Sequence, residues 1–272
     1  MIRLLFAFAV CLVTFSTEQV SAAPPPPDPF AVNEQAMIRA ITNKNLSQVT
    51  VLSHDPYYQP NVTWGNNSED SYISQVIFTG CNSAILSQLL TTGADPNAAP
   101  QYHGEPVLYW SMDICPALVQ PMLQAHADPN ISFCWGNWCG PVIADYGFVE
   151  TPAEIHMCSD QYTTQVKEFM QVGADANGVL HDRHGGISKE SVLWAYLTDG
   201  EVCTDQISIL IDKSFAHPAD VNWQMAHGTK PIDYVAQCVP PPKRQPVMQI
   251  LISNGSPPAR PTPVNCNNPQ SW

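Results

Sequence analysis

The feature that most constrains this 272-residue chain is a four-residue motif, Ala-Asp-x-Asn, which occurs four times. The copies begin at Ala94, Ala127, Ala174 and Ala219. The first two aspartates are 33 residues apart (95 to 128), and the later spacings are 47 and 45 residues (128 to 175 and 175 to 220). Self-similarity at a period of about 20–50 residues indicates a chain of stacked units, each contacting mainly its neighbours.

Each copy of the motif follows a segment whose apolar residues recur at helical spacing, as in Ile85–Leu90. Gly93 ends the first of these helices, because glycine readily adopts the left-handed conformation of a helix C-cap. In the second and fourth units this glycine is replaced by His126 and Pro218. Proline cannot adopt a positive φ, so the sequence predicts a different ending for the fourth of these helices.

A shorter helical segment precedes each of these helices, and several of the short segments open with a proline. Residues 228–234, Gly-Thr-Lys-Pro-Ile-Asp-Tyr, resemble the Gly-x-Thr-Pro-Leu-His opening of an ankyrin repeat. Proline suits a helix start because its missing N–H would be unpaired there. The chain therefore resembles the ankyrin-repeat family over residues 33–256. The resemblance implies an all-α solenoid of about five helix-turn-helix units with inter-repeat loops, preceded by an N-terminal cap.

The ends of the chain differ in composition from the repeats. Residues 1–22 read as a cleaved signal peptide, because Arg3 precedes an apolar run from Leu4 to Val13 and small residues follow. The run is too short for the alternative, a membrane anchor. We interpret 23–32 as a proline-rich spacer and 257–272 as a proline-rich tail, for which Cys266 offers an anchor. These features predict a periplasmic or secreted protein.

The formal net charge of −13 restricts the choice of partners. An acidic surface repels phosphate backbones and anionic membranes, so we expect neither nucleic-acid binding nor membrane insertion. The charge favours a basic protein partner, or it only keeps the chain soluble. We expect a monomer.

Eight cysteines follow the signal segment, and an even number in an exported chain predicts disulfides. The alternative is that they are small buried apolar residues. Equivalent positions in a stack lie about 10 Å apart, whereas a disulfide needs Cα atoms within roughly 7 Å, so only unequal loops could join neighbours. Cys134 and Cys139 lie in one inter-repeat loop and predict a local bridge; the other pairings stay open. Five of the others fall between the first and second helix of a unit: Cys81, Cys115, Cys158, Cys203 and Cys238.

Catalytic patterns are scarce. The densest titratable cluster, His181-Asp182-Arg183-His184, could serve a metal or acid–base site, but it fits a polar inter-repeat loop better because no further ligand is assignable. The sequence has neither a glycine-rich phosphate loop after a strand nor a Gly-x-Ser-x-Gly elbow. We therefore expect no enzyme activity, no cofactor and no metal.

The resemblance implies that the inter-repeat loops and first helices form a concave surface that receives protein partners. Trp135 and Trp138 flank a Gly-Asn pair, so we expect exposed rings that act as anchors. On the first helices, Tyr109, Trp110, Tyr146 and Trp194 are further candidates, with inter-repeat core as the alternative. The predicted partner-binding residues in the loops are Tyr102, His103, Trp135, Asn137, Trp138, His181, Asp182, Arg183, Trp223 and Gln224.

Together these features predict an exported protein-binding module. The resemblance is compatible with binding and inhibiting a periplasmic or secreted enzyme, as in self-protection against a toxic hydrolase. A secreted effector or toxin component acting on another cell is the alternative, and an adjacent exported hydrolase or toxin gene would favour inhibition. An enzyme would instead lose its activity when His181 or His184 is changed.

Overall fold

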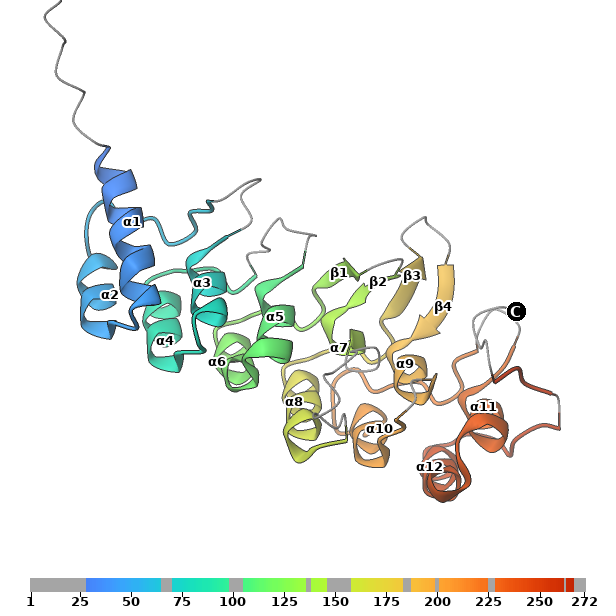
Figure 1. Cartoon of the computed structure of the whole chain (residues 1–272). Helices are drawn as coiled ribbons and strands as arrows, with labels where there is room; N and C mark the ends of the chain where they lie inside the picture. Colours follow the sequence, from blue (N-terminus) through green and yellow to red (C-terminus); the bar gives the residue numbers. More distant parts are fainter. Residues whose placement is uncertain are drawn as a thin grey trace, which may run out of the picture.

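The computed structural model describes residues 28–64, 70–97, 105–135, 138–145, 158–182, 187–198, 201–224, 228–261 and 263–266, with the backbone alone at 135, 138, 145, 181, 182 and 187–190. This part of the chain contains twelve α-helices in six consecutive pairs, which are stacked along one direction (Figure 1). The predicted all-α repeat architecture is confirmed. The first helices of the pairs are α1 (Pro29–Thr42), α3 (Tyr72–Phe78), α5 (Val107–Ile114), α7 (Val142–Asp145), α9 (Val192–Thr198) and α11 (Pro231–Cys238). The second helices are α2 (Leu46–Leu52), α4 (Ser83–Thr91), α6 (Val119–Gln124), α8 (Asp160–Gln171), α10 (Thr204–Leu210) and α12 (Pro241–Ser253), with the 3-10 turn η1 (Pro116–Leu118) before α6.

The two rows of helices enclose one apolar core. Second helices pack on second helices from α2 through α12, and first helices pack on first helices on either side of the middle of the stack. The predicted inward face of α4 is fully buried at Ile85, Leu86 and Leu89. Burying apolar side chains between neighbouring units is what holds such a stack together, because one unit cannot bury its apolar face alone.

Second helices end in a left-handed residue, as the glycine pattern predicts, and in one of them a histidine takes the place of glycine. Gly93 and Gly173 have φ values of 98° and 95°, and His126 takes the same left-handed conformation with φ of 67°. In the fourth unit Pro218 cannot do so, and α10 ends at Leu210, eight residues before it. The N–H of Ala219 still reaches back to the carbonyl of Leu210, at 2.7 Å. The different ending predicted for this helix is confirmed.

The Ala-Asp-x-Asn motif joins each unit to the next by hydrogen bonds. The side chain of Asn97 accepts the N–H of Asp128 at 2.6 Å, and its amide donates to the carbonyl of His126 at 3.2 Å. The carboxylate of Asp95 holds this asparagine in place by accepting its backbone N–H at 2.8 Å. Asn130 and its later equivalents repeat the arrangement. We call this series of bonds the asparagine ladder.

The asparagine ladder begins one unit earlier than the motif does. Asn61 accepts the N–H of Asp95 at 2.7 Å and donates to the carbonyl of Gly93 at 3.3 Å. It belongs to the sequence Pro60-Asn61, which keeps only the second half of the motif. The helix pair α1–α2 is therefore bonded to the stack in the same way as the later units.

Two units carry short β-hairpins where the sequence predicts only loops. The strands β1 (Ser132–Trp135), β2 (Trp138–Pro141), β3 (Val179–Asp182) and β4 (Ile187–Ser191) form one antiparallel sheet in that order. In Figure 1 the sheet projects from the first helices on the side away from the second helices. We call this four-stranded projection the finger sheet.

Four disulfides tie the stack together. The column of cysteines pairs between neighbouring units, with Cα–Cα distances of 5.4 Å for Cys81–Cys115 and 5.1 Å for Cys158–Cys203. The Cα atoms of cysteines at equivalent positions of neighbouring units therefore lie closer together than the repeat spacing suggests. Cys134 and Cys139 are joined across the β1–β2 hairpin, and Cys238 is joined to Cys266 of the tail.

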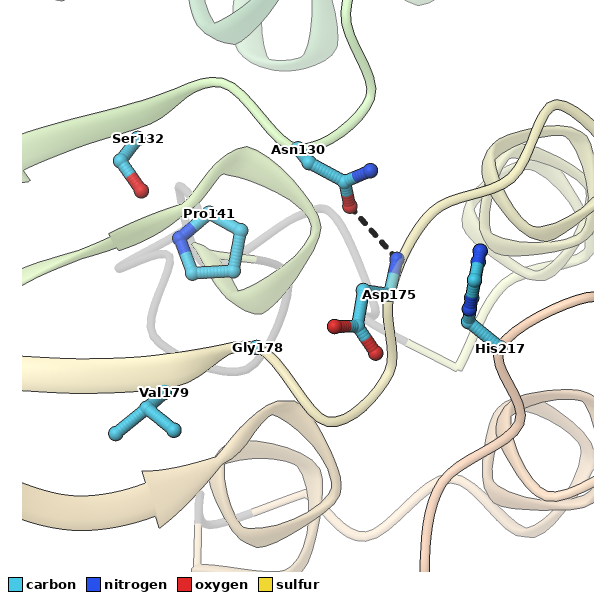
Figure 2. A pocket seen from close by; sticks show the side chains of 7 residues that line it. All are labelled: Asn130, Ser132, Pro141, Asp175, Gly178, Val179 and His217. Atoms are coloured by element: carbon cyan, nitrogen blue, oxygen red, sulfur yellow. Dashed lines mark hydrogen bonds between the residues drawn. The ribbon is translucent and has the colours of Figure 1, made fainter.

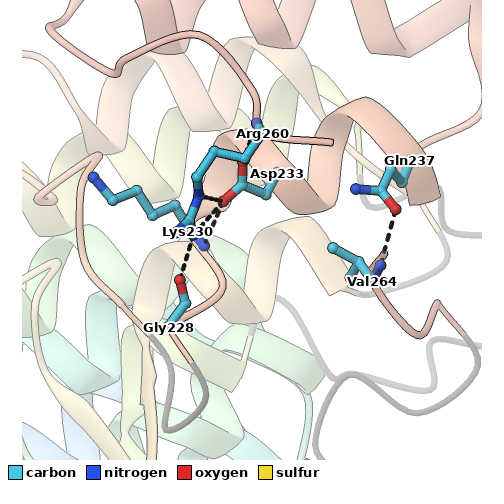
Figure 3. Close-up of polar contacts among 6 residues, drawn as sticks. All are labelled: Gly228, Lys230, Asp233, Gln237, Arg260 and Val264. Atoms are coloured by element: carbon cyan, nitrogen blue, oxygen red, sulfur yellow. Dashed lines mark hydrogen bonds and ion pairs between the residues drawn. The ribbon is translucent and has the colours of Figure 1, made fainter. Parts of the chain in front are cut away.

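The C-terminal tail lies against α11, the first helix of the last pair (Figure 3). Arg260 forms an ion pair of 2.7 Å with the buried carboxylate of Asp233 and also donates its backbone N–H to it at 2.7 Å. The N–H of Val264 bonds to Gln237 at 2.8 Å. Burial would raise the pKa of Asp233, but the hydrogen bonds from Arg260 and Lys230 outweigh it and hold that pKa below its usual value. The tail thus supplies partners to α11 where the stack ends.

Candidate protein-binding surface

The finger sheet brings two of the predicted binding segments together. Trp135 and Trp138 are paired across the β1–β2 hairpin, and Trp138 is also paired with Asp182 of β3. His181 lies opposite Cys139 in the same ladder. Segments more than forty residues apart in sequence therefore share one platform.

The Cys134–Cys139 disulfide closes the hairpin that carries both tryptophans. Its Cα atoms are directly paired across the two strands, 3.9 Å apart. The cross-link restricts the hairpin on top of its backbone hydrogen bonds, and a segment ordered in advance loses less entropy when a partner binds.

The other predicted loop residues are only partly placed. Trp223 is half-buried and packs against the core, so part of its ring serves the fold. Gln224 is exposed beside it. The remaining members lie outside the described residues: Tyr102, His103, Asn137 and Arg183.

Most aromatic rings on the first helices belong to the core between repeats, which the sequence analysis gave as the alternative. Trp194 is fully buried, with its ring centroid 5.5 Å from that of Tyr234 in the next unit. Tyr109 is buried as well. Tyr146 lies outside the described residues.

An exposed apolar group lies on the first helices, and of its members the sequence singled out only Trp110. Phe78, the last residue of α3, is 53% exposed, and Ile114, the last residue of α5, is 40% exposed. The ring of Trp110 lies between these helices, 5.5 Å from that of Phe78 in an edge-on arrangement. We call Phe78, Trp110 and Ile114 the apolar patch. Periodicity could not reveal Phe78 and Ile114, because the same residue types fill the neighbouring core positions.

Aromatic rings connect the apolar patch to the finger sheet. Trp110 contacts Tyr109 with a centroid distance of 5.3 Å, and Tyr109 lies 4.5 Å from Phe133 of β1. Phe133 is buried beneath the sheet. Direct packing of aromatic rings therefore connects α3 and α5 to the base of the finger sheet.

A polar hollow of about 410 Å³ lies at the base of the finger sheet (Figure 2). Ser132 and Pro141 line it from the first hairpin, Asp175 from the asparagine ladder, and His217 from the loop before Pro218. One oxygen of Asp175 accepts the N–H of Asn177 at 2.9 Å. Among the described contacts no hydrogen bond links Ser132 to His217, or His217 to Asp175, so the side chains do not form a nucleophile–base pair. The hollow is suited to accepting a polar or basic group.

Other site types find little support in this part of the chain. No group of three or more His, Cys, Asp and Glu side chains that could hold a metal occurs among the described residues. Within the same ranges, no helix has the length and apolar character needed to cross a membrane.

The comparisons with known proteins support the fold. The ankyrin repeat domain of Bcl-3, a member of the IkappaB protein family, superposes with a TM-score of 0.54 at 18% identity, over 86% of this chain and 90% of that one. EF0377, an ankyrin repeat protein, gives a TM-score of 0.52 at 14% identity, over 80% of this chain and 96% of that one. No protein-family model and no curated protein sequence matches the chain.

The molecule is therefore an ankyrin-repeat protein in its fold. The fold predicted from the Ala-Asp-x-Asn motif is confirmed.

Proposed function

We propose that this protein is an exported interaction module that binds and inhibits a basic enzyme in the periplasm or the medium. The ankyrin fold supports a protein partner. The four disulfides support an oxidising compartment, because such bonds form and persist outside the cytosol. The net charge of −13 supports a basic partner, which it would attract over a distance of about one Debye length.

The observation that carries the proposal is the apolar patch beside the finger sheet. Phe78 and Trp110 pack edge to face on neighbouring units, so their relative positions are fixed before a partner arrives. Large aromatic side chains held in advance are typical of binding hot spots, because they bury much area at little entropic cost. The finger sheet next to them adds Trp135 and Trp138, which we still propose as anchors.

The test is partner capture by matched variants of the mature protein. Wild-type protein, immobilised, is exposed to a periplasmic or culture extract of its own host, and any bound enzyme is purified and titrated. Trp110→Ala and Phe78→Ala should weaken binding by at least about tenfold each, since truncating an interface anchor costs more than about 1.4 kcal/mol. Val172→Ala is the control, because Val172 is 44% exposed at the end of a second helix.

Two results separate binding from inhibition. Stoichiometric loss of the enzyme's activity on titration, relieved by Trp110→Ala, supports the full proposal. Capture without loss of activity supports a scaffold and contradicts inhibition. If Val172→Ala weakens binding as much as Trp110→Ala, the surface of first helices and fingers is not the binding site.

A further inference from the structure

The Cys158–Cys203 disulfide is chemically asymmetric. Cys158, just before α8, is exposed, whereas Cys203, the N-cap of α10, is only 4% exposed. Both line a hollow of about 210 Å³ that opens to solvent, together with Thr163, Val202, Thr204, Asp205 and Lys243. An external thiol can therefore approach one sulfur of the pair more easily than the other.

A lysine from a different unit stands beside the exposed sulfur. The Nζ atom of Lys243, on α12, lies 3.9 Å from the Sγ atom of Cys158. Glu201 lies 4.0 Å from the same ammonium, and Asp205 of α10 is the other charged residue that lines the hollow. A cation in contact with a sulfur favours its thiolate over its thiol, whereas nearby carboxylates favour the thiol.

We propose that Cys158 is a thiol–disulfide exchange site, with Cys203 as its buried resolving partner and Lys243 as the residue that stabilises the Cys158 thiolate. The co-reactant is a dithiol, either a small molecule or an exported dithiol oxidoreductase. The proposal concerns a modification site and does not depend on which protein the apolar patch binds.

The exchange proceeds in two steps. A thiolate of the dithiol attacks the Sγ atom of Cys158, an S–S bond forms between them, and Cys203 leaves as a thiolate that takes up a proton. The second thiol of the reductant then attacks, as its thiolate, the reductant's first sulfur in the mixed disulfide. This closes the reductant's disulfide and expels Cys158 as a thiolate beside Lys243. The dithiol is oxidised by two electrons to a disulfide, and the protein disulfide is reduced to two thiol groups.

The other three disulfides lack this combination. Cys81–Cys115 also joins a half-buried cysteine to a buried one, but among the described contacts no lysine approaches either sulfur, and Cys134–Cys139 lies within the β1–β2 ladder. Cys266 is exposed, but among the described contacts no lysine approaches its sulfur. These three pairs serve as internal controls in one molecule.

The first experiment reduces the folded wild-type protein in glutathione redox buffers of graded ratio and then alkylates the free thiols. Mass spectrometry of the peptides reports each cysteine separately. We expect Cys158 and Cys203 to be released first and glutathione to be found on Cys158 rather than Cys203. Earlier release of any other pair, or glutathione mainly on Cys203, would overturn the proposal.

The second experiment tests the role of Lys243 without a cysteine change. Lys243→Met should slow the reduction of this pair at pH 7 by at least about threefold, because the Cys158 thiolate that leaves in the second step loses its cation. Lys243→Arg should restore most of the rate, and the rates of the other three pairs should not change. Once the pair is reduced, the pH profile of Cys158 alkylation should shift upward in Lys243→Met. Equal rates and pH profiles in wild type and Lys243→Met would contradict an active role for the lysine.

Discussion

The asparagine ladder predicts a specific loss of stability when one of its members is removed. Asn97→Ala removes two hydrogen bonds between units, one accepted from the N–H of Asp128 and one donated to the carbonyl of His126. Each hydrogen bond contributes about 0.5–1.5 kcal/mol of net stabilisation, so the free energy of unfolding should fall by about 1–3 kcal/mol. Asp128 is exposed, so water can partly replace the lost partner, which places the expectation in the lower half of that range.

The assay is urea unfolding of the oxidised protein, followed by far-ultraviolet circular dichroism. Asn43→Ala is the matched control, because Asn43 is exposed after α1 and takes no part in the ladder; it should change stability by less than about 0.5 kcal/mol. In a melting experiment each kcal/mol corresponds to about 2–4 °C for a domain of this size. If Asn97→Ala and Asn43→Ala unfold alike, the ladder does not stabilise the stack and our reading of the motif is wrong.

Three further expectations follow from the same structure. Leu89→Ala, at a fully buried position, should cost about 2–5 kcal/mol in urea unfolding, and a loss within error would mean that α4 is misplaced. Because the pKa of Asp233 is lowered in the fold, its ion pair stabilises the protein above the ordinary aspartate pKa of about 3.9, and this contribution disappears as pH falls through the lower folded value. Arg260→Met should therefore reduce stability at pH 7 and flatten its loss between pH 4 and pH 2; equal acid unfolding curves would refute the pairing. Trp135→Ala and Trp138→Ala should melt near wild type yet bind an identified partner about thirtyfold more weakly, and loss of stability in both would make the hairpin structural.

The sequence predicted the repeat architecture because the motif has a direct structural task. Asp95 holds the turn and Asn97 bonds to the next unit, so both residue types recur wherever a unit meets its neighbour. Asn61 escaped detection because its unit keeps the bonding asparagine but has lost the aspartate. A search for Pro-Asn alone finds it together with Asn97 and Asn130, but misses Asn177 and Asn222.

The finger sheet and the disulfide pairing could not be derived from the sequence. The four strands have four or five residues each, too few to show an alternating pattern, and their pairing depends on two units standing side by side. The cysteine column was visible, but the repeat spacing of about 10 Å argued against bonds between neighbours. The Cα atoms of Cys81 and Cys115 in fact approach to 5.4 Å, because one lies in a left-handed turn and the other just before η1.

The apolar patch shows the limit of pattern reading for a binding site. Phe78 and Ile114 continue the apolar composition of helices whose other residues face the core. Their positions at the helix ends leave them exposed. Exposure of this kind depends on tertiary packing and not on residue type.

The central claim, that this stack holds a protein through its first helices and finger sheet, is tested most directly by hydrogen exchange with and without the captured partner. Backbone amides in α3, α5 and the four strands should exchange more slowly in the complex, while those in the second helices α2, α4 and α12 should exchange at unchanged rates. Protection confined to the second helices, or no protection at stoichiometric partner, would contradict the account.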